Sequence, residues 1–254
     1  MPGYRADVAI SGDRIAAIGD LAGEAATETI DAEGMTVSPG FIDGHTHMDA
    51  QVFWDPLGTC SSWQGVTSVI MGNCGFTLAP CAEKDKRLVF TNLERAEDIS
   101  PEAMEAGIPW SWTTYPEYLD AVEKLPKALN YAAYVGHSAL RTYVMGQRAF
   151  TDQATPDDLA AMKREFEAGM RAGGLGLSTS RSRNHRTAEG QPVASRIGDW
   201  SEVEALTQVM ADLGFGVFEI SRGIGNNDQE ERTLELTRLK SLALDLGVPI
   251  TYGG

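Results

Sequence analysis

Apolar runs of strand type alternate with helical patterns along most of this chain of 254 residues. Alternation of this kind is typical of a parallel sheet built from βα units, in which each helix returns the chain to the start of the next strand. With 43% hydrophobic residues, the chain is long enough for one large α/β domain and a small appendage. The strand-type runs cover residues 36–45, 66–73, 131–136, 175–179, 215–220 and 249–252.

Helix boundaries can be read between the later runs. Thr155 can cap a helix whose first residue is Pro156, with Asp158 three positions after the cap. This helix is expected to stop at the glycine pair that begins with Gly173. Two further helices are expected over residues 200–213 and 228–246, each ending at a glycine and followed directly by a strand-type run.

A domain boundary is expected near Gly34. Residues 1–34 hold two short strand patterns, 7–10 and 15–18, and are interpreted as part of a small β domain. Residues 35–254 would form the α/β domain, with residues 75–129 as an insertion carrying short helices. The aromatic stretch around Trp110 and Trp112 in this insertion could shape a pocket or serve only for packing.

The run from Pro39 to His47 ends in two histidines at strand spacing, His45 and His47. Side chains two residues apart on a strand point to the same face, so two neutral imidazoles could bind one divalent ion there. Cys74 follows the second run. A free cysteine is more often a small buried apolar residue, but beside this pair a thiolate could complete or bridge a zinc site.

Composition and charge restrict the function classes. A formal net charge of −15 leaves no basic stripe for nucleic acid, and no apolar run approaches the roughly 20 residues that span a bilayer. Three cysteines are too few and odd in number for a disulfide framework, and a cytoplasmic location is expected. Arg181, Arg183 and Arg186 gather around His185, either as a solvated basic loop or as an anion site.

Several short sequence motifs resemble those of the amidohydrolase superfamily, and within it those of the N-acyl-D-amino-acid deacylase (D-aminoacylase) branch. Residues 35–49 read MTVSPGFIDGHTHMD, the His-x-His entry of the superfamily. The strand end Gly72-Asn73-Cys74-Gly75-Phe76 points to the branch. Residues 135–141, VGHSALR, and 174–179, GLGLST, extend the likeness over nearly the whole chain. The resemblance implies a (β/α) TIM-like barrel preceded by a small β domain.

The resemblance also implies a reaction, a cofactor and roles for named residues. It implies zinc, as one or two divalent ions, with Cys74 as a ligand beside the two histidines. The reaction would be hydrolysis of an amide C–N bond in a small N-acyl amino acid or related amide, most directly deacylation of N-acyl-D-amino acids. Arg181, Arg183 and His185 are candidates for binding the substrate carboxylate, and His137 for orienting the substrate near its carbonyl.

The chain departs from the family pattern in two places. The fifth and sixth strands carry no histidine, and Glu219 could supply an oxygen ligand instead or be a salt-bridged residue with no metal role. The sequence stops after the sixth strand, so the family's general-base aspartate, expected on the eighth, has no counterpart here. Six strands would leave open edges, which predicts a homo-oligomer or a chain lacking its C-terminal part.

Two other functions stay open. One is a catalytically silent fragment that keeps the family's sequence without its reaction. The other is a cyclic amidase resembling dihydroorotase or hydantoinase, enzymes that generally use a carboxylated lysine from the fourth strand. Residues 174–180 contain no lysine, which disfavours this second alternative.

Overall fold

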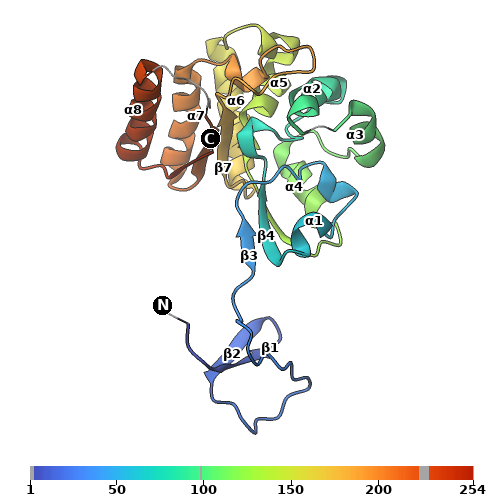
Figure 1. Ribbon diagram of the computed structural model, residues 1–254. Helices are drawn as coiled ribbons and strands as arrows, with labels where there is room; N and C mark the ends of the chain where they lie inside the picture. Colours follow the sequence, from blue (N-terminus) through green and yellow to red (C-terminus); the bar gives the residue numbers. More distant parts are fainter. Residues whose placement is uncertain (1–2, 98, 223–228, 254) are drawn as a thin grey trace. The chain divides into compact units, whose positions relative to one another are not determined.

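A computed structural model describes residues 3–97, 99–222 and 229–253 (Figure 1). The chain divides into two compact units, Met1–Pro39 and Gly40–Gly254. The first unit contains an antiparallel hairpin of β1 (Asp7–Ser11) and β2 (Arg14–Gly19). Gly12 adopts a left-handed φ of 61° in the connecting turn, a conformation that glycine reaches without steric cost.

The second unit holds all the described helices longer than one turn and seven strands. Its strands are β3 (Phe41–Asp43), β4 (Val66–Met71), β5 (Asn130–Ala133), β6 (Val135–Gly136), β7 (Gly176–Ser180), β8 (Val217–Ser221) and β9 (Ile250–Gly253). Its helices are α1 (Thr59–Ser62), α2 (Lys86–Glu97), α3 (Pro101–Gly107), α4 (Tyr115–Glu123), α5 (His137–Met145), α6 (Pro156–Arg171), α7 (Trp200–Leu213) and α8 (Gln229–Asp245).

The strands of the second unit are parallel and follow the order of the sequence. One sheet has the order β3-β4-β5 and the other β6-β7-β8-β9. Only Tyr134 separates β5 from β6, so these two strands are one of the six predicted runs, interrupted at a single residue. Within the described residues β3 and β9 are edge strands, and the barrel is not closed. The fold is therefore an incomplete (β/α) barrel of six strands, which confirms the expected fold class.

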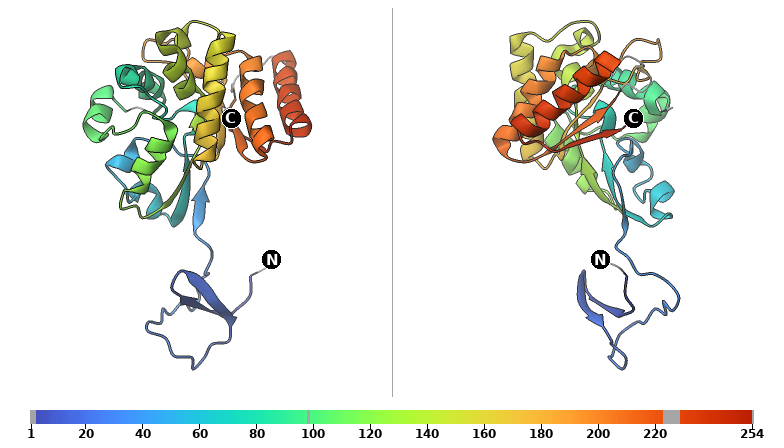
Figure 2. Two further views of the ribbon diagram at one scale, coloured as in Figure 1. Left: turned by 180° about the vertical axis from the view of Figure 1, so that it is seen from behind. Right: turned by 60° about the vertical axis from the view of Figure 1, so that its left-hand side comes forward.

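Helices pack on the strands by their apolar faces. Figure 2 shows α6, α7 and α8 side by side, covering one face of the strands. Helix α6 buries Met162, Phe166 and Met170, whose spacing of four places them on one face. The expected capping box at the start of α6 is present. Helix α7 ends before Gly214, as predicted, and Gly214 has a left-handed φ of 76°. Helix α8 also agrees, except that residue 228 lies outside the described residues.

Two of the predicted runs end earlier than expected, and each early end has a local cause. The first run gives a strand only over Phe41–Asp43. At its end the Asp43 carboxylate accepts a hydrogen bond from the backbone N–H of His45 at 3.2 Å and starts a turn. The second strand stops before Gly72, whose φ is 77°. The candidate ligands His45, His47 and Cys74 therefore follow their strands instead of ending them.

The insertion over residues 75–129 forms α2, α3 and α4 and contributes to the core. The Trp112 indole is buried and donates a hydrogen bond from Nε1 to the carbonyl of Leu78 at 3.0 Å. Trp110 and Phe53 each stack against it at a ring-centroid distance of 5.0 Å. These contacts favour the packing interpretation of the two tryptophans. Among the described residues, no helix combines the length and the apolar character that a membrane span requires.

Candidate metal centre

His45, His47 and Cys74 come together at the carboxyl ends of β3 and β4. One potential ligand atom from each residue lies within 4.8 Å of the others. The Cys74 Sγ atom is 3.3 Å from Nε2 of His45, and the two imidazole rings are 5.3 Å apart at an angle of 73°. Two imidazoles and a thiolate are the donor types that zinc takes in proteins. The structure therefore groups the three residues whose donor chemistry suits such an ion.

The Cys74 side chain is placed by a tight turn after β4. Gly72, Cys74 and Gly75 all have left-handed φ values, of 77°, 60° and 80°. Cys74 is the one described non-glycine residue with a positive φ, a conformation that costs free energy and persists only where neighbouring contacts hold it. One such contact is the hydrogen bond that the Cys74 backbone N–H donates to Oε2 of Glu219 at 2.7 Å.

The imidazoles of the cluster favour the neutral state. Burial lowers the pKa of His45, against the opposing charge of Asp43. Burial, followed by the neighbouring His45 and His185, lowers the pKa of His47 to about 4. A neutral imidazole keeps the lone pair with which it binds a metal, whereas a protonated ring has none to offer. The protonation states near neutral pH thus suit a cation at this place.

Glu219 lies beside the cluster but outside the group of three. Its Oε1 atom is 3.9 Å from Nδ1 of His45 and has no hydrogen-bond partner within the described part of the chain. Burial raises the pKa of Glu219 to about 8, although the hydrogen bond from Cys74 opposes the rise. A buried carboxylate oxygen without a partner is costly, so a ligand role for Glu219 remains open. Its observed contact is with the backbone of Cys74.

His185 is connected to the cluster by Phe76, whose ring contacts both His185 and His47. The ring of Phe76 is 5.0 Å from that of His185 and 6.0 Å from that of His47. The Nδ1 atom of His185 is 2.7 Å from the Ser180 hydroxyl oxygen at the end of β7. Burial, then the charge of Arg196, lowers the pKa of His185 to about 4. Of the four substrate-binding candidates, His185 is the one whose contacts lead to the cluster.

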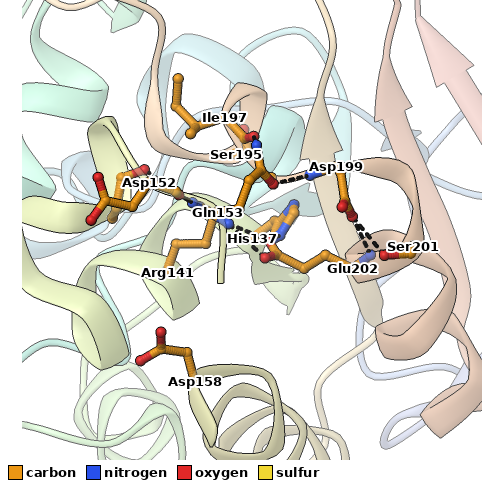
Figure 3. Close-up of polar contacts among 12 residues, drawn as sticks. His137, Arg141, Asp152, Gln153, Asp158, Ser195, Ile197, Asp199, Ser201 and Glu202 are labelled. Carbon is orange, nitrogen blue, oxygen red and sulfur yellow. Dashed lines mark hydrogen bonds and ion pairs between the residues drawn. The ribbon is translucent and has the colours of Figure 1, made fainter. Parts of the chain in front are cut away.

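His137 occupies a different environment, a buried polar network drawn in Figure 3. Its Nε2 atom is 2.6 Å from Oε1 of Glu202, and its Nδ1 atom is 2.8 Å from the Thr179 hydroxyl. Arg141 donates to both oxygens of Glu202 at 2.6 Å. His137 and Arg141 are fully buried. With both ring nitrogens occupied and no exposed surface, His137 fits a structural role better than the substrate contact expected from the sequence.

The arginines after β7 are also engaged. Arg181 donates to the carbonyl groups of Ser195, Gly198 and Asp199, at distances from 2.6 to 3.2 Å. These contacts favour a structural role in holding the loop before α7 over carboxylate binding. Arg183 forms an exposed ion pair with Glu231 at 3.2 Å, where both side chains remain accessible to solvent. Arg183 therefore stays available as an anion-binding group.

Three polar residues around the Cys74 turn were not singled out from the sequence. The Asp49 carboxylate, 1% exposed, accepts a hydrogen bond from the backbone N–H of Gly72 at 2.8 Å. Ser178 donates from its hydroxyl to the Gly72 carbonyl and accepts from the N–H of Gly75. Asn73 bonds to two backbone carbonyls. Ser178 lies inside β7, whereas Asp49 and Asn73 follow β3 and β4, and no pattern in the sequence marks the three as one group.

A cavity of about 390 Å³ opens beside His45. Its lining comes from β3, β8, β9 and the turn after β4, and includes Asp43, Asn73, Glu219 and Tyr252. Ligands of parallel α/β folds bind at the carboxyl ends of the strands, and the cavity has that position. The arrangement offers a small molecule access to His45.

The fold and the donor set define the class of protein: an incomplete α/β barrel with the nitrogen and sulfur donors of a candidate metal site at the carboxyl ends of its strands. The chain belongs to the amidohydrolase family, whose model matches residues 28–247.

The chain is also similar in sequence to named enzymes. A D-aminoacylase of Alcaligenes xylosoxydans xylosoxydans is 42% identical over 181 residues, covering 70% of this chain and 34% of the relative. An N-acyl-D-glutamate deacylase of the same organism is 33% identical over 213 residues, covering 84% of this chain and 39% of the relative. The chain thus spans little more than a third of the length of these relatives.

Solved structures show the same relationship. A crystal structure of D-aminoacylase has a TM-score of 0.75 at 30% identity, covering 99% of this chain and 48% of the other. An N-acyl-D-glutamate deacylase from Bordetella bronchiseptica, complexed with zinc and a phosphonate mimic of the tetrahedral intermediate, has a TM-score of 0.74 at 27% identity. It covers 98% of this chain and 47% of the other.

Proposed function

We propose that this protein is a metal-dependent hydrolase of amide C–N bonds that deacylates N-acyl-D-amino acids. The observation that carries the proposal is the grouping of His45, His47 and Cys74 within 4.8 Å at the carboxyl ends of barrel strands. The names of the relatives, D-aminoacylase and N-acyl-D-glutamate deacylase, support the substrate class. The neighbouring structure with zinc supports the metal.

The two imidazoles and the thiolate would hold one zinc ion, and Glu219 is the nearest candidate for a further oxygen ligand. A divalent ion bound there supplies Lewis-acid chemistry for hydrolysis of an amide. The protein's own residues prepare the ligands for metal binding. Burial favours the neutral form of the imidazoles, and the turn after β4 places the Cys74 thiol next to His45.

The substrate carboxylate requires a cationic or hydrogen-bonding partner near the cluster. His185 reaches the cluster through Phe76, and Arg183 lies two residues earlier on the same loop. Arg183 forms an exposed ion pair with Glu231, and exposed ion pairs contribute little free energy. A substrate carboxylate can therefore displace Glu231 from Arg183 at small cost, and we propose Arg183 and His185 as the carboxylate-binding pair.

The test combines metal analysis with an activity assay on the purified chain. After incubation with zinc and removal of the excess, the chain should retain the ion and hydrolyse N-acetyl-D-amino acids faster than their L enantiomers. A chain that retains zinc but leaves these compounds intact would indicate the catalytically silent alternative. Preferential hydrolysis of dihydroorotate or a hydantoin would indicate the cyclic-amidase alternative. Retention of no metal would refute the proposed function.

We also propose that the chain self-associates through its open sheet edges. The edge strand β3 exposes Phe41 and Ile42, and Tyr252 is exposed on the opposite edge, β9. Unpaired edges with apolar side chains favour pairing with another chain. Light scattering should give a mass above that of the monomer, and Ile42→Lys should lower it. A monomeric wild-type chain at high concentration would contradict self-association.

We also propose a cytoplasmic location. The three free cysteines are compatible with that reducing compartment.

A further inference from the structure

Two segments carry the candidate ligands: the one after β3 with His45 and His47, and the one after β4 with Cys74. Hydrogen bonds connect them beyond the end of the ladder between β3 and β4. The pairing of β3 with β4 ends at Asp43 and Val69, before His45 and Cys74 are reached. In an ordinary sheet the ladder itself would fix the distance between two such segments. Here the distance between the histidine pair and the cysteine must be fixed by other contacts.

Those contacts converge on the carbonyl of Ile70. It accepts hydrogen bonds from the Thr46 backbone N–H at 2.9 Å, from the Thr46 hydroxyl at 2.8 Å and from Nδ2 of Asn73 at 2.9 Å. Thr46 stands between the two histidines, and Asn73 directly precedes Cys74. One carbonyl thus binds groups from both ligand segments.

Asn73 closes the connection from the other side. Its Nδ2 atom also donates to the carbonyl of Thr46 at 3.1 Å, so the two N–H groups of one side-chain amide bond to both segments. The Asn73 side chain is fully buried, so water does not compete for these bonds. The backbone of Asn73 is held through its neighbour Gly72. The Gly72 N–H donates to the Asp49 carboxylate, and the Gly72 carbonyl accepts from the Ser178 hydroxyl.

We propose that Asn73, together with the Thr46 hydroxyl, is a positioning element that sets the distance between the histidine pair and Cys74 and thereby the affinity and geometry of metal binding. The proposal rests on the metal site of the proposed function and goes beyond it in assigning a role to residues that are not ligands. Partners that orient metal ligands typically change affinity by about 10- to 100-fold when removed.

Cobalt provides the readout, because a cobalt–thiolate bond gives a charge-transfer absorption band and the visible bands of cobalt report its coordination geometry. The full chain is titrated with Co²⁺. Asn73→Ala removes both amide bonds and should weaken cobalt binding by about 10- to 100-fold and reduce the thiolate band. Thr46→Val is isosteric, removes only the hydroxyl bond and should have a smaller effect in the same direction. Thr46→Ser restores the hydroxyl and should bind cobalt like the wild type.

Asn92→Ala is the matched control. Asn92 is also buried, and its amide likewise joins two segments, donating to the Leu88 carbonyl and accepting from the N–H of Ala194. Neither segment carries a candidate ligand, so this variant should lose stability but keep the cobalt spectrum. A general loss of packing would instead affect both asparagine variants alike.

The outcomes separate this inference from the proposed function. Wild-type cobalt spectrum and affinity in both Asn73→Ala and Thr46→Val would overturn the positioning role alone. Absence of a thiolate band in the wild type would overturn the metal site and the positioning role with it. If Asn73→Ala does not fold, as judged by circular dichroism, the comparison of Thr46→Val with Thr46→Ser decides the question.

Discussion

Glu219 accepts a hydrogen bond from the backbone N–H of Cys74 at 2.7 Å, which connects two residues 145 positions apart in the sequence. The carboxylate is 1% exposed, and its acceptor atom stabilises the left-handed backbone of the cysteine. A residue expected to act as a metal ligand thus also holds the residue beside it. The two roles can be distinguished by substitution.

Replacing Glu219 by alanine should lower the free energy of unfolding by about 1–3 kcal/mol, because the Cys74 N–H is left buried without an acceptor. Glu219→Gln keeps an acceptor oxygen and should stay closer to the wild type. Urea denaturation of the metal-free chain measures both. Equal stability of Glu219→Ala and the wild type would show that the hydrogen bond makes no net contribution.

Substitution of Cys74 should remove metal binding, whereas substitution of Cys81 should not. Both thiols are buried, but Cys81 bonds to the carbonyl of Ala82 and lies outside the ligand group. Cys74→Ala should therefore lose most of its bound zinc, since two imidazoles alone rarely retain the ion. Elemental analysis after dialysis measures zinc per chain. An unchanged zinc content in Cys74→Ala would exclude the thiolate as a ligand.

Glu202→Gln should destabilise the protein by about 3–5 kcal/mol, because it leaves the charge of Arg141 buried without a counter-ion. The Arg141 side chain is fully buried and directs one nitrogen at both oxygens of Glu202 (Figure 3). Glu204→Gln is the control on the same helix, at an exposed position, and should change the stability little. Chemical denaturation at neutral pH compares the two. A loss below 1 kcal/mol in Glu202→Gln would contradict the importance of the buried pair.

The stability lost in Glu202→Gln should depend on pH. Burial would raise the pKa of Glu202, but the hydrogen bond from His137 and the charge of Arg141 outweigh it and lower the pKa from 4.5 to about 2. A lowered carboxylate pKa contributes stability that is complete above the unfolded value and is lost as the pH falls through the folded value. This lowering corresponds to roughly 3 kcal/mol.

The difference in unfolding free energy between wild type and Glu202→Gln should therefore be constant above pH 5 and shrink as the pH falls from about 4.5 to about 2. Denaturation curves collected at several pH values measure it. A difference that stays the same down to pH 2.5 would show that folding does not lower the pKa of Glu202.

Much of the helical structure could be predicted because its signals are local. Thr155, Pro156 and Asp158 form a capping box through bonds that span three residues, and Gly214 ends α7 by its own backbone conformation. The first strand was predicted to end later than it does, because the turn that ends it depends on one hydrogen bond between Asp43 and His45. Side-chain competition for a backbone N–H is weakly encoded in the apolar pattern.

The candidate site was only partly visible in the sequence. The spacing of His45 and His47 predicted a shared direction, and the structure does bring them together with Cys74. His137 and Arg181 were expected to contact substrate, and their partners in the fold were not predicted. His137 bonds to Glu202, and Arg181 bonds to carbonyl groups of the loop before α7. Residue type indicates what a side chain can bind, but several partners are possible until the fold selects one.

The amino-acid sequence by itself determined the alternation of strands and helices, the family and the donor types of the candidate centre, because periodicity, caps and residue chemistry are properties of neighbouring positions. The tertiary structure alone decided which polar groups meet. The bonds of Asn73 to Thr46, of Cys74 to Glu219 and of His137 to Glu202 span 27, 145 and 65 residues. Contacts over such distances form only when the packing of the strands has excluded water, and no local pattern specifies them.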